Sequence, residues 1–507
     1  MSRASRSRRR SLEYALSPGA ATAIVTVAVL LLACAEAAAP PEELPVPIAR
    51  VRLSLDSAVL MEGETLQLSV VVSDSAGELL TGRDVLLYSM NSRVATVAPD
   101  GSVDARSYGS AMIVARAEGV RDTAWIDVQL LFQTVSAGAA HTCGISATGN
   151  TYCWGEGSMG RLGSGADRSS AVPVLVDGGL IFSALSAGGE STCALTGFAA
   201  FCWGSNNARQ LGTGGKFDSW VPAAVAGSHV FQVLEVGTVH ACGLASDGAA
   251  LCWGSDWGGQ IGNGARPRPF QPDTVAGGQR FAAISPGWSF TCGATTDGVP
   301  YCWGFNEHRQ LGADEDESCH TLSGDYRPCS TDPLAVGTTQ RFSAIVAGTV
   351  HVCGLTSSGN AYCWGANDAG QLGIGTTTVV PGPTPVVGDI SFAALTAGDR
   401  HTCGLTADGA AYCWGDNALG ALGTADVGEH CQGDPCSTIP VRAAAPFHFA
   451  VVSASRGPNG SHTCGVTPSG HAYCWGRNTA GQLGAGAGGG SGFQPQLVKG
   501  QPEPFEN

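Results

Sequence analysis

Cys-Trp-Gly occurs seven times along this chain, and this repeat constrains the fold more than any other feature of the sequence. A further cysteine precedes each copy by nine or ten residues, and the copies recur roughly every fifty residues, with two longer intervals. Seven units of this length, rich in short strands and turns, predict an all-β chain with a seven-bladed β-propeller. The repeated tryptophans are Trp154, Trp203, Trp253, Trp303, Trp364, Trp414 and Trp475.

The two cysteines of each repeat predict a β-hairpin. Placing Cys403 opposite Cys413 leaves a three-residue loop that ends in Gly409, the position that needs a positive φ. In the second repeat the cysteines are one residue closer, and the loop becomes a two-residue turn that begins with Gly197. The turn residues change together with the spacing, which supports the hairpin in every repeat.

Two other repeated positions predict details of the hairpin. Gly404 falls opposite Tyr412, so we expect the tyrosine ring to lie over the cross-strand glycine. The third residue after each repeated tryptophan is Asn, Asp or Gly, as at Asn417. These residue types tolerate a left-handed backbone, which predicts a turn at that residue.

The chain has 19 cysteines, and all but Cys34 sort into local pairs. Seven pairs belong to the hairpins, and each of the two longer intervals adds one more. Facing strand residues lie near disulfide distance, and exported proteins use such frameworks. The predicted disulfides are Cys143–Cys153, Cys193–Cys202, Cys242–Cys252, Cys292–Cys302, Cys319–Cys329, Cys353–Cys363, Cys403–Cys413, Cys431–Cys436 and Cys464–Cys474.

Zinc is the competing interpretation of these cysteines. Five repeats carry His-x-Cys, and residues two apart on a strand share a face. Two repeats, however, replace the histidine by Ser191 and Phe290 and still keep both cysteines. A ligand set should not lose members in this way. We therefore expect no metal or cofactor, and histidines that hydrogen-bond between blades.

The N-terminus has the pattern of an export signal. Five arginines within residues 1–10 precede the apolar run 21–33, which is short for a membrane span, and Cys34 follows. Leu-Leu-Ala-Cys resembles the lipobox of bacterial lipoproteins, which implies lipidation of Cys34 after removal of 1–33; ordinary signal cleavage a few residues later is the alternative. Residues 34–47, rich in alanine and proline, predict a semi-rigid tether.

The repeat unit AGxxHTCGLTxxGxAYCWGxNxxGQLGxG resembles the regulator of chromosome condensation repeat, over residues 131–500. The resemblance implies a seven-bladed propeller that binds proteins. The eukaryotic founder of the family is a nuclear nucleotide exchange factor. The paired cysteines and the export signal depart from the founder, so we do not expect exchange activity here. Many bacterial relatives are secreted, and one inhibits β-lactamases.

Residues 48–130 contain no cysteine and follow a different pattern. Short alternating strands with turn signals predict a β-sandwich, and the segment resembles a bacterial Ig-like domain of surface adhesins. The expected organisation is therefore a signal peptide (1–33), a linker (34–47), an Ig-like domain (48–130), a propeller (131–500) and a short tail (501–507).

Aromatic residues that the repeat does not require are candidates for partner contact. Trp and Arg on loops are typical of binding hot spots, although packing beneath the long connections is the alternative. The predicted partner-binding residues are Phe217, Trp220, Trp257, Arg266, Arg268 and Trp288, and Phe270 and Phe290 belong to the same set of unexpected aromatics.

The two insertions are further contact candidates. Residues 313–330 and 424–437 are each closed by a predicted disulfide, which lowers the cost of ordering a loop on binding. The first contains Asp314, Glu315, Asp316 and Glu317, which favour either calcium binding or a solvated acidic loop.

No nucleophile–base pair, phosphate loop or carboxylate pair stands out from the repeats, so we expect no enzyme. The net charge of −15 argues against nucleic acid, and against a membrane contact other than a lipid anchor. The sequence predicts a monomeric, envelope-anchored or secreted binding protein for an extracytoplasmic protein or glycan. The alternatives are an inhibitor of an extracellular hydrolase and an enzyme that uses the propeller channel.

Overall fold

The structure is a computed structural model that describes residues 45–265, 269–314, 317–320, 324–425, 427–443 and 446–504. Within these residues the regular structure is almost entirely β-strand, and the single helical element is a 3₁₀ turn at Ser158–Gly160. None of the described residues belongs to an apolar helix of membrane-spanning length. The predicted all-β class is confirmed.

Nine strands build a sandwich before the propeller. Burial alternates along β8 and β9, so that Ile113, Ile126 and Val128 point into one core with Val103. The sheets are β2-β9-β8-β5, β3-β7-β6 and β1-β4. The strands are β1 (Arg50–Leu53), β2 (Ser57–Met61), β3 (Thr65–Gln67), β4 (Val70–Ser73), β5 (Leu86–Ser89), β6 (Ala95–Val97), β7 (Ser102–Ala105), β8 (Gly109–Ala117) and β9 (Val120–Gln129).

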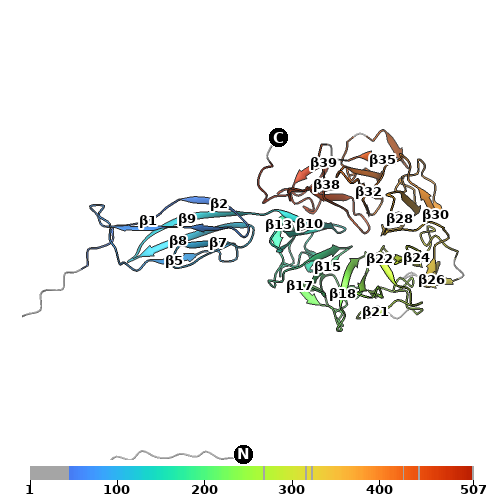
Figure 1. Cartoon of the computed structure of the whole chain (residues 1–507), viewed down its shortest axis with the longest axis horizontal. Coiled ribbons are helices and arrows are strands. Elements are labelled where there is room, and N and C mark those ends of the chain that lie inside the picture. The colour runs from blue at the N-terminus through green and yellow to red at the C-terminus, as the bar shows by residue number, and fades with distance from the viewer. Residues whose placement is uncertain are drawn as a thin grey trace, which may run out of the picture. The chain divides into compact units, whose positions relative to one another are not determined.

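Seven antiparallel sheets follow, which we number blades 1 to 7 in chain order. Their inner strands contact one another in a closed ring, from blade 1 through to blade 7 and back to blade 1, as Figure 1 shows. The inner strands are β10 (Phe132–Ala137), β14 (Ala184–Ala187), β18 (Phe231–Val236), β22 (Phe281–Pro286), β27 (Ala344–Ala347), β31 (Ala394–Ala397) and β36 (Val451–Ala454).

The second and third strands of each blade form the cysteine hairpin. The second strands are β11 (His141–Ser146), β15 (Ser191–Thr196), β19 (His240–Ala245), β23 (Phe290–Thr295), β28 (His351–Leu355), β32 (His401–Leu405) and β37 (His462–Val466). The third strands are β12 (Thr151–Gly155), β16 (Ala199–Gly204), β20 (Ala250–Gly254), β24 (Pro300–Phe305), β29 (Ala361–Gly365), β33 (Ala411–Asp416) and β38 (Ala472–Arg477).

A fourth strand completes each blade on the outside. The fourth strands are β13 (Ser170–Leu175), β17 (Ser219–Ala224), β21 (Asp273–Thr274), β26 (Tyr326–Ala335), β30 (Val380–Pro385), β35 (Asp434–Arg442) and β39 (Ser491–Leu497). The two insertions add a fifth, outermost strand to blades 4 and 6, at β25 (Glu317–His320) and β34 (Glu429–Cys431).

The predicted hairpins are present in the structure. Cys403 and Cys413 are register partners, and Gly409 has a φ of +86° in the loop between them. The shorter second repeat turns through Gly197, whose φ is +59°. All nine predicted disulfides are formed, and every one lies within a single blade.

Two details of the hairpin differ from the prediction. Gly404 does lie opposite Tyr412, but the ring that covers it is Phe392, with which a Cβ at Gly404 would clash. Tyr412 meets the edge of that phenylalanine instead, with centroids 6.4 Å apart. The glycine is therefore needed because a ring from its own blade fills the space of a side chain.

The residue three positions after the tryptophan acts through its side chain rather than a left-handed backbone. Asn417 Oδ1 accepts a hydrogen bond from Leu422 N at 3.0 Å, and the left-handed residue is Gly420, with a φ of +84°. The sequence identified the turn but not its mechanism, because Asn supports both a left-handed backbone and an internal side-chain acceptor.

Neighbouring blades are joined by a repeated set of hydrogen bonds. The backbone carbonyl of Gln371 in blade 5 accepts from Thr402 Oγ1 and from Trp414 Nε1 of blade 6, both at 2.9 Å. Thr402 in turn lies 2.8 Å from His351 Nε2. Because the threonine hydroxyl donates to the carbonyl, it accepts from the histidine, which places the proton of His351 on Nε2.

The joint between blades 7 and 1 is of the same kind. Thr142 Oγ1 and Trp154 Nε1 of blade 1 both donate to the carbonyl of Gln482, and Thr142 pairs with His462. Among the described strands, the first and last blades share none, since each sheet consists of strands that follow one another in the sequence.

Candidate binding site

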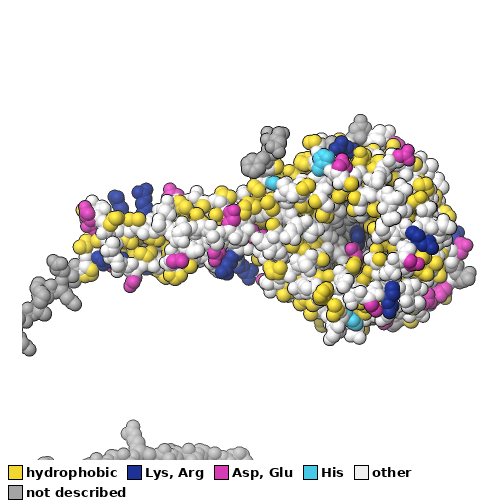
Figure 2. All heavy atoms as spheres, in the orientation of Figure 1, with side chains coloured by type: hydrophobic (Ala, Val, Ile, Leu, Met, Phe, Trp, Pro, Cys, Tyr) yellow, Lys and Arg dark blue, Asp and Glu magenta, His cyan; other side chains and the backbone are white. Residues whose placement is uncertain are grey.

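The candidate site is a pocket of 720 Å³ on one face of the propeller. This face carries the loops between the inner and second strands of the blades. It also carries the loops that follow each Trp-Gly. We call this the loop face. Figure 2 shows that the propeller is hollowed around its axis. The pocket spans blades 2 to 5, and its volume is in the range of ligand pockets. Its principal side chains are Trp257, Trp288, Phe305, Glu307, His308 and Arg327.

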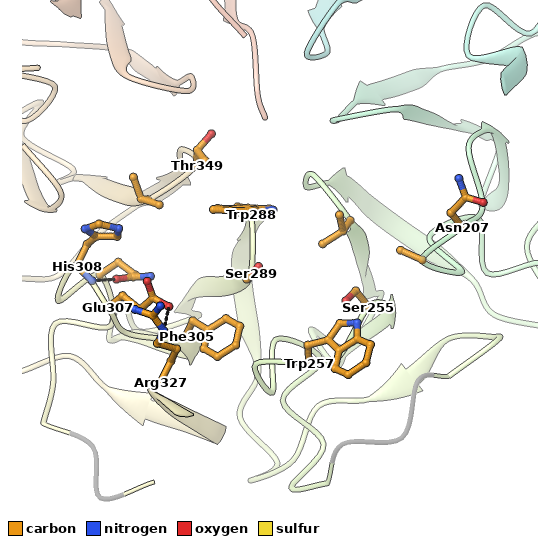
Figure 3. Close-up of a pocket in the computed structure, with 14 residues that line it drawn as sticks. Asn207, Ser255, Trp257, Trp288, Ser289, Phe305, Glu307, His308, Arg327 and Thr349 are labelled. Atoms are coloured by element: carbon orange, nitrogen blue, oxygen red, sulfur yellow. Dashed lines mark hydrogen bonds and ion pairs between the residues drawn. The ribbon is translucent and has the colours of Figure 1, made fainter. Parts of the chain in front are cut away.

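Three aromatic side chains form its walls, and each departs from the repeat at a different position. Trp288 stands in the loop between β22 and β23 and is 44% exposed. Trp257 stands in the loop after β20, and Phe305 ends β24. The Phe305 ring packs on Gly258, where a Cβ would lie 2.6 Å from the ring. Figure 3 shows the three rings around one space.

The charged groups of the pocket are paired with one another. Arg327, from the outer strand of blade 4, lies 3.4 Å from Glu307, and Figure 3 marks this contact. The backbone N–H of His308 donates to Gln310 Oε1, which holds the loop in place. Since the guanidinium and the carboxylate balance each other, the pocket offers apolar walls and hydroxyl groups such as Ser255 and Ser289 to an uncharged group.

The central channel beside the pocket is crossed by an ion pair. Arg456 of blade 7 reaches Glu235 of blade 3, with 2.8 Å between nitrogen and oxygen, and Ser186 also donates to this carboxylate. Both charged side chains are largely shielded from solvent, at 15% and 30% exposure. Gly457 lies beside Gly189, so this loop of blade 7 covers part of the channel mouth.

Acidic groups gather on the loop face at blade 6. Burial raises the pKa of Asp399 and of Asp416, and Asp399 accepts from the backbone N–H of Asn459. Arg400 pairs with Asp368 at 2.6 Å. Among the described residues no group of three His, Cys, Asp or Glu could hold a metal ion.

The repeat histidines bind threonines rather than sharing ligands with the cysteines, whose sulfur atoms are in disulfides. Burial lowers the pKa of His240, His351 and His462 to about 3 and that of His401 to about 4, and it also lowers the pKa of His141. These histidines form hydrogen bonds between blades, as the sequence predicted, and their burial disfavours the charged form.

The structure separates the sequence-predicted contact residues. Trp257 and Trp288 line one pocket, 31 positions apart in sequence. Phe217 and Trp220 are exposed at the outer strand of blade 2, at 77% and 42%. Phe270 lies under the Arg209 guanidinium, 3.6 Å from the ring centroid.

Phe290 was wrongly grouped with the contact candidates, because it is fully buried between blades 4 and 5. Arg266, Arg268, Glu315, Asp316 and Cys34 lie outside the described residues. Glu317 accepts hydrogen bonds from Thr331 across blade 4, which gives it a structural role. Sequence reasoning missed Phe305 and Arg456. A comparison of the residue after each Trp-Gly would have found Phe305.

Family models identify two kinds of unit in the chain. The regulator of chromosome condensation (RCC1) repeat matches residues 132–161, 148–195, 342–371, 358–405, 392–421 and 459–482. The bacterial Ig-like domain (group 2) matches residues 47–128. These matches agree with the resemblances found in the sequence.

Individual relatives are distant. The human and mouse E3 ubiquitin-protein ligases HERC2 are 39% identical over 66 residues, which is 12% of this chain and 1% of theirs. Prp20p of Saccharomyces cerevisiae, described with its binding to Gsp1p and histones, has a TM-score of 0.59 at 21% identity and covers 73% of this chain and 87% of its own. Human WBSCR16 has a TM-score of 0.56 at 18% identity, covering 73% and 97%. At these identities the likeness shows the fold alone.

Proposed function

Since the chain carries RCC1 repeats behind a bacterial Ig-like domain, we propose that it is an exported, envelope-anchored binding protein without enzymatic activity. In this proposal the pocket of blades 2 to 5 holds an apolar side chain of a loop on a protein partner. The RCC1 propeller is a fold suited to a protein-binding scaffold.

The observation that carries the proposal is the convergence of three aromatic residues that the repeat does not require. Trp257, Trp288 and Phe305 come from three repeat positions and surround one pocket. Random departures from a repeat would be scattered over all seven blades. Aromatic residues gathered in one pocket beside an arginine, here Arg327, are the usual composition of a binding hot spot.

The paired charges favour a protein loop over a charged small molecule. Among the residues that line the pocket, the charges of Glu307 and Arg327 oppose each other, and Asp325 outside the lining lies 3.9 Å from the same guanidinium. An apolar anchor gains from burial against the three rings, roughly 25 cal/mol for each Å² removed from water. The disulfide in each blade holds the strands that carry these loops, so the loops lose little conformational freedom on binding.

Export is supported by the cysteine chemistry. Nine disulfides belong to an oxidising compartment outside the cytoplasm. The N-terminal arginines, the apolar run 21–33 and Cys34 supply the signal and the lipid anchor of the proposal. The proposal does not include nucleotide exchange, because a small GTPase would be present in a reducing compartment, where these disulfides would not persist.

Inhibition of an extracellular hydrolase is the second candidate, and the pre-ordered loop face favours it. A rigid pocket that holds a loop of an enzyme next to its active site would block that enzyme. The two candidates share the same surface and differ in what the partner does.

The test starts from envelope extract of the native host. Partners captured by the full chain are identified, purified and titrated against the wild type and two double variants. Trp257→Ala/Trp288→Ala should weaken binding at least about a hundredfold, as expected for two hot-spot residues. Phe217→Ala/Trp220→Ala, a matched removal of exposed aromatics on blade 2, should bind as the wild type does.

The opposite ranking of these two variants would move the site to blade 2 and overturn the proposal. A protease-treated polysaccharide fraction is titrated in parallel, and binding there that depends on Trp288 would assign the pocket to a glycan. Hydrolase activity in the captured fraction, measured with and without the chain, separates an inhibitor from a scaffold.

A further inference from the structure

A second surface lies on the Ig-like domain, on the outer face of the sheet β2-β9-β8-β5 (Figure 1). The outward positions of such a sheet are ordinarily polar. Here Trp125 and Met112 are register partners, and Met90 N donates to the Met112 carbonyl from the next strand. Tyr88 is the partner of Val114 beside them. An apolar stripe therefore runs across the sheet.

The side chains of this stripe are exposed to solvent. Trp125 is 51% exposed and Met90 62%, and Leu86 and Val59 extend the stripe at its margins with 61% and 60%. Single exposed apolar residues are normal, but a contiguous patch marks an interaction surface. We call this the outer sheet face, made of Val59, Leu86, Tyr88, Met90, Met112 and Trp125.

Charges at the two ends of the outer sheet face have opposite signs. At one end Arg116 and Arg121 are direct cross-strand partners. Like charges in that position destabilise a sheet, and no described carboxylate forms an ion pair with either arginine. At the other end Asp127 accepts from Ser110 Oγ and remains exposed. The stripe lies between the arginines and this carboxylate.

We propose that two copies of this chain associate through the outer sheet face, with their β9 strands running antiparallel. In that arrangement the two-fold axis lies between the sheets and across the strands. Arg121 of one copy then meets Asp127 of the other, and Trp125 lies near the middle of the contact. Parallel stacking would instead place the arginine pairs against each other.

General features of sheet packing fit this arrangement. Two sheets pack face to face about 10 Å apart, with interdigitating side chains. Two-fold dimers with self-complementary patches are the commonest oligomers, and methionine adapts readily to a facing surface. The sequence alone led us to expect a monomer, because the repeat pattern of the propeller gives no sign of a face on the Ig-like domain.

This inference is independent of the proposed function, because it uses no residue of the pocket. The loss of one surface by substitution leaves the other intact. A partner bound at Trp288 and a second copy bound at Trp125 are therefore distinguishable with single variants.

The test is sedimentation of the full chain over a concentration series, with thermal unfolding to verify that each variant folds. The wild type should show a reversible monomer–dimer equilibrium. Trp125→Ser and Arg121→Glu should each raise the dimer dissociation constant at least about tenfold. Leu79→Ser, which removes an apolar side chain 69% exposed outside this face, should leave the constant unchanged.

The charge exchange gives the sharpest result. Asp127→Arg alone should weaken the dimer, whereas Arg121→Glu/Asp127→Arg should restore it, because the exchanged charges again meet across the axis. A wild type that stays monomeric, or a dimer insensitive to Trp125→Ser, would overturn the inference. So would a monomer that binds vesicles of phosphatidylethanolamine and phosphatidylglycerol through Trp125, which would assign the face to a membrane.

Discussion

His351 Nε2 of blade 5 lies 2.8 Å from Thr402 Oγ1 of blade 6, and the same pair recurs at five of the seven joints. The two joints without the histidine also lack the threonine. Ser191 has Ala241 at the corresponding position of the next blade, and Phe290 has Val352 in the same buried cluster. The two positions therefore change together, as expected when each satisfies the other.

This pairing predicts the outcome of exchanging one joint for another. Thr402→Val leaves the His351 N–H without an acceptor, which should lower the free energy of unfolding by about 1–3 kcal/mol. His351→Phe/Thr402→Val, copied from Phe290 and Val352, should cost less than the sum of the single changes, by about 1–2 kcal/mol. Urea unfolding of the four proteins measures this coupling, and strict additivity would contradict it.

The buried histidines predict how stability depends on pH. Burial lowers the pKa of His351 to about 3, below the roughly 6.5 of an unfolded chain. The unfolded state therefore binds more protons below about pH 6.5, and the free energy of unfolding should fall as the pH drops from there towards about 3. Above about pH 6.5 the buried histidines should not make the free energy of unfolding depend on pH.

The control for the pH prediction is His351→Phe/Thr402→Val. Its unfolding should take up about one proton fewer than that of the wild type between pH 6 and 4. Carboxyl groups such as Asp399, whose pKa burial raises, titrate in both proteins and cancel from the comparison. Equal slopes for the two proteins would show that this histidine is not neutral in the fold.

Two tryptophans of the repeat differ in one hydrogen bond. Trp253 Nε1 donates to the Gln210 carbonyl at 3.0 Å, whereas Trp203 Nε1 has no acceptor among the described residues. The preceding loop of blade 1 has Arg161 where five of the other blades have glutamine and blade 6 has Ala421, and it contains a 3₁₀ turn.

Replacement by phenylalanine should therefore cost more at Trp253 than at Trp203, by about 1–2 kcal/mol, because only the former leaves a buried carbonyl unpaired. Both changes remove the same volume, so the cavity cost is matched. Chemical denaturation of the two variants gives the difference, and equal costs would refute the role of the bond.

The ion pair across the channel predicts a further coupling. Arg456→Ala leaves Glu235 shielded from solvent and unpaired, and Glu235→Ala leaves the arginine unpaired. Each substitution should lower the free energy of unfolding more in the wild type than in a protein that already carries the other substitution. A double-mutant cycle should give a coupling energy of about 1–3 kcal/mol. Binding at Trp288 should survive both changes. A coupling near zero would mean that the pair does not brace the channel.

Features that depend on local chemistry could be predicted from the sequence. Gly409 and Gly197 predicted the positions of the hairpin loops because only glycine readily takes a positive φ. The disulfides followed from that register. The predicted role of Asn417, a left-handed backbone in the turn, was wrong. A local pattern does not show whether the backbone or the side chain of an asparagine forms the turn.

Contacts between side chains of different blades could not be predicted. Trp257 and Trp288 share a pocket only because blades 3 and 4 are adjacent, and Phe305 joins them through the space at Gly258. Arg456 and Glu235 are 221 positions apart. No periodicity indicates which side chains meet across an axis.

Because every one of the nine disulfides stays inside its own blade, heat or urea without a reductant would release a chain with nine small closed loops rather than a random coil. Strand register could not slip within any of them. Recovery of the native ring would then require only that preformed hairpins pack together in order, which suits folding in an oxidising compartment.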